Sequence, residues 1–486
     1  MQMEKIKKNI SYNIVYQLLN MLLPLITTPY IARVMGVSAV GTFSYTYAIV
    51  QYFMLFVTMG LVNYGNRTIA KSRDNTGLLR KNFWNIYYVQ FMCFLIVSLI
   101  YFIYILFLAD SKYIFILIIQ YIYILSAATD INWLYYGLEK FKAIVIRNSI
   151  IKVFFTILIF IFVKNSKGIY LYTLFCSSGF LIANVSLWKW VFRNLKIIKP
   201  NFKEIKKHFK KNLILFIPVI AISLYNIMDK IMVGSMINVE NVALYDNAEK
   251  IINVPLNILT SVGTAMLPRI SNLVVNNKNN LVKKYIENTM NVLMFMVFPM
   301  IFGLILVSDK LIILYLGDDF KNSIILVKLL SIIILFKTWA NIIRTQYLIP
   351  KEKDTAYIIS IICGALVNLI LNLIMISKIG VVGAVYATII AEVMVCLIQT
   401  ISVRKELPIK KYLNICIKYF LKGIFMYLIL MIEINTLKLN RLSNIFYLIV
   451  IVFSGIIIYS ILNIKSILLN INILRQNYRK NKMNET

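Results

Sequence analysis

Long apolar runs, separated by short polar segments, make up almost the whole of this chain. A bilayer core about 30 Å thick is crossed by about 20 apolar residues in a helix, and runs of that length recur from one end of the sequence to the other. We therefore predict an all-α integral membrane protein with twelve to fourteen transmembrane helices. The predicted spans are 10–34, 43–66, 83–108, 113–138, 148–163, 169–192, 213–236, 243–268, 288–308, 322–349, 355–377, 380–403, 412–434 and 443–464.

The composition supports a membrane location. Of 486 residues, 60% are hydrophobic and 15% are charged, whereas an ordinary soluble domain has about 25% charged residues. The net charge is +32, which in a soluble protein would indicate nucleic-acid binding. Here Lys and Arg are concentrated in every second connecting segment, which is the positive-inside pattern. The charge therefore predicts cytoplasmic termini and attraction to anionic membrane lipids, with no nucleic-acid partner.

Two halves are predicted from a basic connector and an internal similarity. The segment 193–212 carries eight Lys or Arg residues and one acidic residue, and it falls between the sixth and seventh spans. The stretch 33–45 resembles 230–245, and an even number of spans separates them, which favours a parallel repeat. The predicted organisation is a six-helix lobe at 1–192, a basic cytoplasmic connector at 193–212, a second six-helix lobe at 213–403, and two further helices with a basic tail at 404–486.

Metal and enzyme sites find no support in the sequence. The five cysteines are scattered through apolar runs without metal-binding spacing, and the one histidine, His208, lies in what we predict to be a lysine-rich loop. Neither a histidine metal site nor a serine–histidine triad is therefore expected. We predict no catalytic residues, no metal and no enzymatic activity.

Charged residues inside the predicted spans are the candidates for function, because an ionised group at membrane depth needs a partner or a wet cavity. Asp229 and Lys230 are neighbours in the seventh span and point about 100° apart on a helix, so we expect them to contact different partners. Helix-joining ion pairs are the alternative for any single residue. We predict a polar cavity between two lobes, with candidate residues Arg33, Asp130, Asp229, Lys230, Glu249, Lys250, Lys337, Arg344 and Glu392, and with Asp246 beside them.

Several stretches, taken in order, resemble the polysaccharide (O-antigen or capsule) repeat-unit flippases of the multidrug/oligosaccharidyl-lipid/polysaccharide exporter superfamily. They are "QLLNMLLPLITTPYIARVMG", "NYGNRTIA", "TDINWLYYGLEKFKAIVIRN", "FIPVIAISLYNIMDKIMVG", "YDNAEKIINVPLNILTSVGTAMLPRIS" and "LYLGDDF". The resemblance runs from the first span through the twelfth. The positions that match family motifs are Arg33, Arg67, Asp130, Asp229, Lys230, Glu249 and Lys250.

This resemblance implies a flippase in the bacterial cytoplasmic (inner) membrane. It would move an undecaprenyl-pyrophosphate-linked oligosaccharide to the outer leaflet by alternating access, for O-antigen, capsule or exopolysaccharide synthesis. It implies no cofactor, but coupling to a gradient of protons or sodium ions. The implied partners are the lipid-linked substrate, membrane lipids, a polysaccharide polymerase and chain-length machinery.

Two alternatives stay open. A multidrug or peptidoglycan-precursor exporter of the same superfamily would share the composition and the helices. A membrane polysaccharide polymerase or ligase would need a catalytic site supported by a sizeable loop or domain, whereas the predicted outer loops are short.

Overall fold

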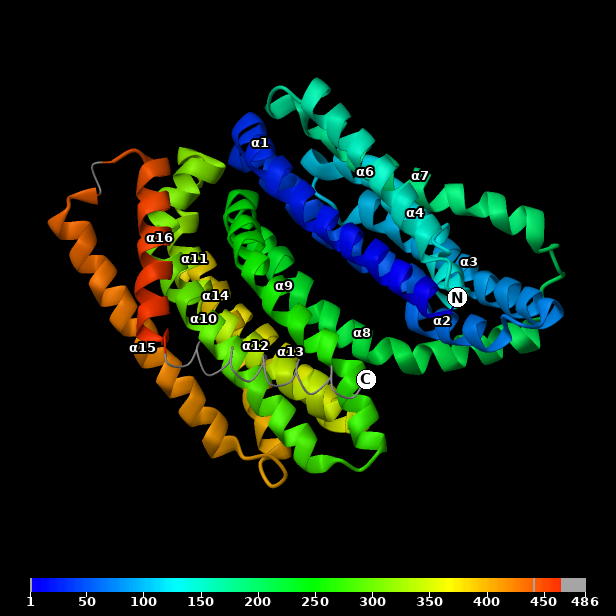
Figure 1. Cartoon of the computed structure of the whole chain (residues 1–486). Coiled ribbons are helices and arrows are strands. Elements are labelled where there is room, and N and C mark those ends of the chain that lie inside the picture. The colour runs from blue at the N-terminus through cyan, green and yellow to red at the C-terminus, as the bar shows by residue number, and fades with distance from the viewer. Residues whose placement is uncertain (1, 440–441, 465–486) are drawn as a thin grey trace. The chain divides into compact units, whose positions relative to one another are not determined.

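The computed structural model describes residues 2–439 and 442–464, and within them all regular structure is helical (Figure 1). Twelve helical stretches are long and apolar enough to cross a membrane. The first of these, Leu22–Ser72, contains two predicted spans, and the seventh predicted span lies in a further long helix, α8. The all-α prediction is confirmed, and the basic tail predicted at 465–486 lies outside the described residues.

The helices follow the predicted apolar runs closely. They are α1 (Gln2–Thr58), α2 (Leu61–Ser72), α3 (Thr76–Phe107), α4 (Ile114–Ala128), α5 (Asn132–Gly137), α6 (Phe141–Phe162), α7 (Ile169–Asn194), α8 (Phe202–Met236), α9 (Val239–Val275), α10 (Asn279–Leu316), α11 (Ser323–Leu330), α12 (Ile333–Ile343), α13 (Asp354–Ile379), α14 (Val381–Val403), α15 (Ile409–Thr436) and α16 (Asn444–Leu462).

The helix α1 reverses direction at Gly36, where φ is 73° and ψ is 173°. A straight helix of its length would extend about 85 Å, nearly three times the bilayer core. The Tyr30 hydroxyl donates to the Val163 carbonyl at the end of α6, and the Tyr45 ring lies 5.5 Å from that of Tyr113, just before α4. Both contacts lie on the predicted outer side. Glycine tolerates the positive φ because it has no Cβ, so one residue joins two spans.

Two predicted spans end earlier than expected. The second was predicted to run to residue 66, but its helix ends at Thr58, and a turn at Met59 and Gly60 leads into α2. The fourth was predicted at 113–138, but it is interrupted between Ala128 and Asn132. An apolar run alone does not show where a helix breaks.

The basic connector is mostly helical, so the predicted loop at 193–212 is wrong. After seven residues outside helix, α8 begins at Phe202 and continues through the lysine-rich segment into the seventh span. The Asn201 side chain accepts hydrogen bonds from the backbone N–H groups of Lys203 and Glu204. Asparagine is a favoured N-cap, and lysine is a good helix former.

The described chain divides into two compact units. Unit 1 comprises Met1–Asp246 and Ala365–Ala387, and unit 2 comprises Asn247–Gly364 and Thr388–Thr486. The lobe boundaries drawn from the sequence at 192, 213 and 403 stay a prediction. In unit 2, α15 and α16 pack along α10, where Phe302, Leu306 and Tyr447 contribute to an apolar cluster.

A dense aromatic cluster forms part of the core of unit 1. It contains Trp84, Trp133 and Trp188, and Trp190 packs against it. The rings of Trp84 and Trp188 lie 6.3 Å apart, and the Trp188 indole N–H donates to the Thr129 carbonyl at the end of α4. The cluster therefore braces the break between α4 and α5.

Candidate functional site

Asp130 occupies the break between α4 and α5 in unit 1. Its Oδ1 accepts a hydrogen bond from the backbone N–H of Asn132 at 2.9 Å and another from the Asn132 amide at 2.6 Å. Aspartate and asparagine commonly make such bonds two residues along the chain, and these bonds compete with the helix. The local sequence "TDIN" thus both interrupts the helix and fixes the carboxylate.

Buried and half-buried amides connect this break to the neighbouring helices. The Asn132 amide donates to Asn184 Oδ1 on α7 at 3.3 Å, and the Asn184 amide donates to the hydroxyl of Ser126 on α4 at 3.0 Å. From α6, Arg147 donates to Asn132 Oδ1 at 3.4 Å and to Asn148 Oδ1 at 2.6 Å. The network ties three membrane helices to the Asp130 segment.

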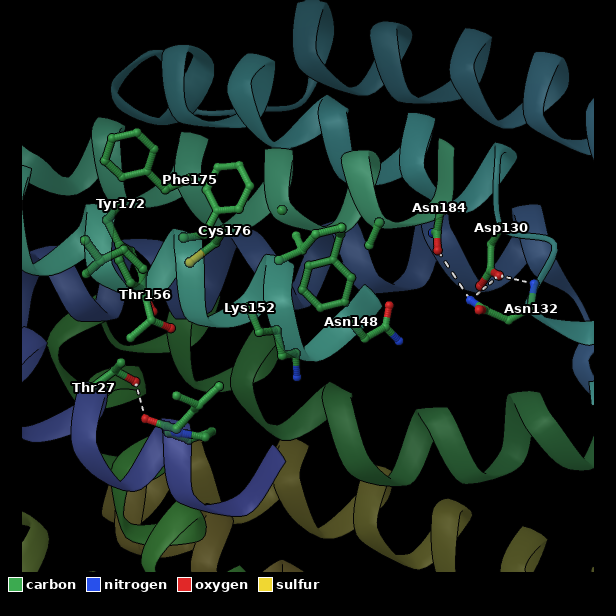
Figure 2. A pocket seen from close by; sticks show the side chains of 18 of the residues that line it. Thr27, Asp130, Asn132, Asn148, Lys152, Thr156, Tyr172, Phe175, Cys176 and Asn184 are labelled. Atoms are coloured by element: carbon green, nitrogen blue, oxygen red, sulfur yellow. Dashed lines mark hydrogen bonds between the residues drawn. The ribbon is translucent and has the colours of Figure 1, made fainter. Parts of the chain in front are cut away.

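A cavity of about 330 Å³ opens beside this network, within the range of small-molecule sites. Figure 2 shows Asp130, Asn132, Asn148 and Asn184 toward one end, Tyr172, Phe175 and Cys176 toward the other, and Lys152 between them. The helices α1, α6 and α7 supply most of the wall. We call this the Asp130 cavity; it is polar at one end and aromatic at the other.

A second polar cluster in unit 1 surrounds Asp229, which is 3% exposed. Its carboxylate accepts hydrogen bonds from the Tyr245 hydroxyl at 2.8 Å and from the Asn372 amide at 2.5 Å. Lys230 instead forms an ion pair of 2.5 Å with Asp246. The prediction that these neighbours contact different partners is therefore confirmed.

The candidate residues of unit 2 include one close pair. Lys337 on α12 lies 3.0 Å from Glu392 on α14, and the Glu392 side chain is 4% exposed. Arg344 begins a π-helical turn, Arg344–Leu348, with its guanidinium 5.6 Å from the centre of the Tyr357 ring. On α9, Glu249 is half-buried and Lys250 is exposed.

Among the ten residues predicted for the site, Asp130 alone belongs to the described lining of the Asp130 cavity. Arg33 is exposed near the reversal of α1, and Arg67 is exposed on α2. The structure therefore places the predicted charges in several local clusters within the two units.

Sequence reasoning missed Arg147, Asn148, Lys152 and Asn184. The fifth span was predicted to begin at 148, so Arg147 was assigned to a loop, but α6 begins at Phe141. Lys152 was a visible signal, because it is a charge within an apolar run. The asparagines gave a weaker signal, because a neutral side chain stands out little in such a run.

His208 was also missed, since it is buried rather than in a loop. Its Nδ1 lies 2.7 Å from the hydroxyl of Tyr64 on α2. Burial is the main cause that lowers the pKa of His208; Lys207, Lys211 and Lys81 lower it further, and Glu204 acts in the opposite direction.

Comparison with known proteins identifies the family. The sequence pattern of the polysaccharide biosynthesis protein family matches residues 6–274, more than half of the chain. The chain belongs to this family. A second pattern, that of the MatE family, matches residues 215–374, so this family member also carries a signature of the wider exporter superfamily.

Individual relatives agree with this assignment. A putative O-antigen transporter of Escherichia coli K12 is 25% identical over 408 residues, which cover 82% of this chain and 97% of the relative. A probable low-salt glycan biosynthesis flippase of Haloferax volcanii is 27% identical over 193 residues, covering 39% of this chain and 40% of the relative. The solved structure of lipid II flippase MurJ in an inward closed conformation matches with a TM-score of 0.77 and 19% identity, over 96% of this chain and all of that one. This last match shows a shared fold.

Proposed function

We propose that this protein is a flippase for undecaprenyl-pyrophosphate-linked oligosaccharide repeat units in O-antigen, capsule or exopolysaccharide synthesis. The observation that carries the proposal is the similarity to an O-antigen transporter along nearly the whole length of that relative. The family and the probable glycan biosynthesis flippase of Haloferax volcanii support the same class of cargo. The protein acts as a transporter, without a chemical step.

Such a cargo needs both apolar and polar surroundings, and unit 1 offers both. Its lipid tail can remain in the bilayer beside exposed apolar side chains such as Leu95, Leu99 and Leu106 on α3. Its glycan and pyrophosphate need polar groups, because unsatisfied polar groups in an apolar environment cost several kcal/mol. Under this proposal alternating access exposes to the substrate the charges Arg33, Arg67, Asp130, Asp229, Lys230, Glu249, Lys250 and Arg344, while the candidates Lys337 and Glu392 form an ion pair that holds α12 to α14.

An ion gradient drives the cycle in this proposal, and Asp229 is its coupling carboxylate. The support is the burial of Asp229 and its hydrogen bonds to Tyr245 and Asn372. Buried intramembrane carboxylates commonly serve proton or ion pathways. Replacing a sodium gradient by a proton gradient in proteoliposomes identifies the coupling ion; transport that is unaffected by both gradients would contradict this role.

The decisive experiment combines gene deletion with reconstitution. Deletion should abolish surface polymer while lipid-linked repeat units accumulate on the cytoplasmic side. Purified protein in proteoliposomes should then move those extracted lipids to the opposite leaflet. Accumulation on the outer face would instead indicate a polymerase or ligase, and would overturn the flippase proposal.

The proposed location is the bacterial inner membrane, with both termini in the cytoplasm. The support is the distribution of Lys and Arg, which are concentrated in the connecting segments on the same side as 193–212. Such a concentration marks the cytoplasmic side. A reporter active only in the cytoplasm should work when fused after Ile198 and be silent when fused after Asp319. The reverse pattern would overturn the orientation. A polymerase and chain-length proteins are the proposed further partners, testable by cross-linking in cells.

A peptidoglycan-precursor or multidrug exporter is the second candidate function. The MatE match at 215–374 favours it. Complementation separates the two: rescue of a strain that lacks its lipid II flippase, together with normal surface polymer in the deletion strain, would favour this second function.

A further inference from the structure

We propose that the Asp130 cavity binds one sugar residue of the lipid-linked glycan. This inference rests on the proposed function and assigns a glycan-binding site to unit 1. The described lining of the cavity lies within that unit and comes from α1, α5, α6, α7 and the break that holds Asp130. Its volume of about 330 Å³ is at the small end of ligand sites, as expected for one ring of a longer glycan.

The polar end has the hydrogen-bonding chemistry of a sugar site. Each sugar hydroxyl both donates and accepts. The N–H bonds of Asn132 and Asn184 already donate within the network, so these two residues offer a sugar hydroxyl the second lone pair of their carbonyl oxygens. Asn132, Asn148 and Asn184 line the cavity, and each is held by a bond to a neighbour. Because these groups are oriented before a ligand arrives, binding loses little side-chain entropy.

The aromatic end suits the apolar face of a sugar ring. Phe155, Tyr172, Phe175 and Phe180 line it, and the C–H groups on one face of a pyranose can pack on an aromatic surface, whose face carries negative charge density. Gly179 allows the Phe155 ring to pack closely against α7, because a Cβ there would lie 3.2 Å from that ring. A sugar ring has one apolar face and polar edges. An aromatic wall opposite fixed amides suits both kinds of surface.

Other ligands fit less well. A lipid acyl chain would place hydrocarbon against the ionisable groups of Asp130 and Lys152, which is costly. A phosphate group is bound best by several cations or by a forked arginine, whereas the described lining of the cavity contains one cation, Lys152, beside the carboxyl group of Asp130. The lining is therefore selective for a largely neutral polar ring.

Cys176 provides a direct measurement, because it lines the cavity. In a variant that keeps this cysteine and has alanine at the other four, the rate of N-ethylmaleimide labelling in membrane vesicles reports access to the cavity. The probe is the lipid-linked oligosaccharide extracted from the deletion strain, compared with undecaprenyl pyrophosphate that carries no sugar. We expect labelling to slow at least threefold with the oligosaccharide and to stay unchanged with the bare lipid. A cysteine placed at Ile150, which is 63% exposed, is the control and should not be protected.

A pair of adjacent phenylalanines gives a matched transport test. Phe155 lines the cavity, whereas Phe154 is 54% exposed. We expect Phe155→Ala to slow glycan-lipid translocation at least fivefold and to abolish protection of Cys176, while Phe154→Ala behaves as the parent protein. This pair decides the question even if Cys176 reacts slowly.

The outcomes separate the two proposals. Equal protection by the bare lipid would place an acyl chain in the cavity and overturn the sugar site. Absence of protection in vesicles that do translocate, or equal translocation by both phenylalanine variants, would also overturn it. Protection by the oligosaccharide without translocation would overturn the flippase proposal and leave the sugar site in place.

Discussion

The described residues include two lysine–carboxylate pairs inside the membrane helices, one in each unit, and these two pairs differ in their surroundings. Lys230 and Asp246 of unit 1 are 2.5 Å apart, and Lys337 and Glu392 of unit 2 are 3.0 Å apart. In both pairs the carboxylate is buried and the lysine is partly exposed. Asp246 also accepts a hydrogen bond from Ser44 at 2.9 Å, so the first pair joins α1, α8 and α9.

Asp229, the residue beside Lys230, makes the surroundings of the two pairs differ further. Asp229 accepts hydrogen bonds from Tyr245 and Asn372, and the Asn372 amide also donates to Asn368. The unit 1 pair therefore lies beside a second set of hydrogen bonds, and we call the two sets together the unit 1 network. It contacts α1, α8, α9 and α13, whereas the unit 2 pair joins α12 to α14. We infer that the unit 2 pair serves mainly to hold two helices together, and that the unit 1 network also serves transport.

The largest expected effect is the loss of one partner from either pair. Lys230→Ala removes the ion pair to the buried Asp246, and Lys337→Ala removes the ion pair to the buried Glu392. Breaking a buried pair in this way costs about 3–5 kcal/mol. Thermal unfolding of the purified proteins measures both losses, and a cost below about 1 kcal/mol would show that water or another cation replaces the lysine.

Replacing both partners of a pair should have different effects in the two units. Lys337→Leu with Glu392→Leu removes both charges, and such exchanges are often neutral or stabilising by about 1–4 kcal/mol. Lys230→Leu with Asp246→Leu removes the acceptor of Ser44 as well, and an unsatisfied buried group costs about 1–3 kcal/mol. We expect the first double variant to regain stability and surface polymer, and the second to regain neither fully. Equal recovery would remove the distinction between the units.

Asp229→Asn tests whether the unit 1 network acts in transport. The substituted amide keeps the shape but adds two donors where Tyr245 and Asn372 already donate, and it removes the negative charge. We expect at least a tenfold loss of translocation, equivalent to about 1.4 kcal/mol, with membrane abundance within twofold of the parent. Immunoblots and surface-polymer assays on the same cells measure both quantities. Full polymer display would assign Asp229 to structure alone.

The smallest effect concerns His208, outside the spans. Its folded-state pKa is lowered by burial, so the imidazole is neutral in the folded protein and the unfolded state binds a proton first. Stability is therefore present at neutral pH and decreases as the pH falls through about 6.5. Asparagine in His208→Asn can still hydrogen-bond to Tyr64 but does not titrate. We expect the variant to lose less stability on acidification than the parent protein, by less than about 1 kcal/mol in the free energy of unfolding. Unfolding midpoints between pH 8 and pH 5 measure it, and identical profiles would contradict the assignment.

The apolar runs predicted the helices well because a bilayer demands long stretches of apolar side chains and satisfies no backbone group. The breaks were harder to predict. A chain reversal at Gly36 needs one glycine, and the interruption at Asp130 depends on a side-chain bond to Asn132, which leaves no trace in hydropathy.

The charged residues of the candidate site could be predicted from the sequence, but its neutral residues hardly could. Asp229 and Lys230 were conspicuous because ions are rare in apolar runs, and their separate partners followed from helix geometry. Asn372 and Asn184 became visible as partners only when distant segments were brought together. Pairing between helices depends on tertiary packing, which a pattern along one helix does not contain.

Four of the five tryptophans belong to the aromatic cluster of unit 1, and the fifth, Trp339, lies in unit 2. Intrinsic fluorescence of this protein is therefore dominated by one region, with rings close enough to exchange excitation energy. Because the Trp188 indole donates to the Thr129 carbonyl beside Asp130, that emission is a dye-free optical report on the segment that borders the cavity.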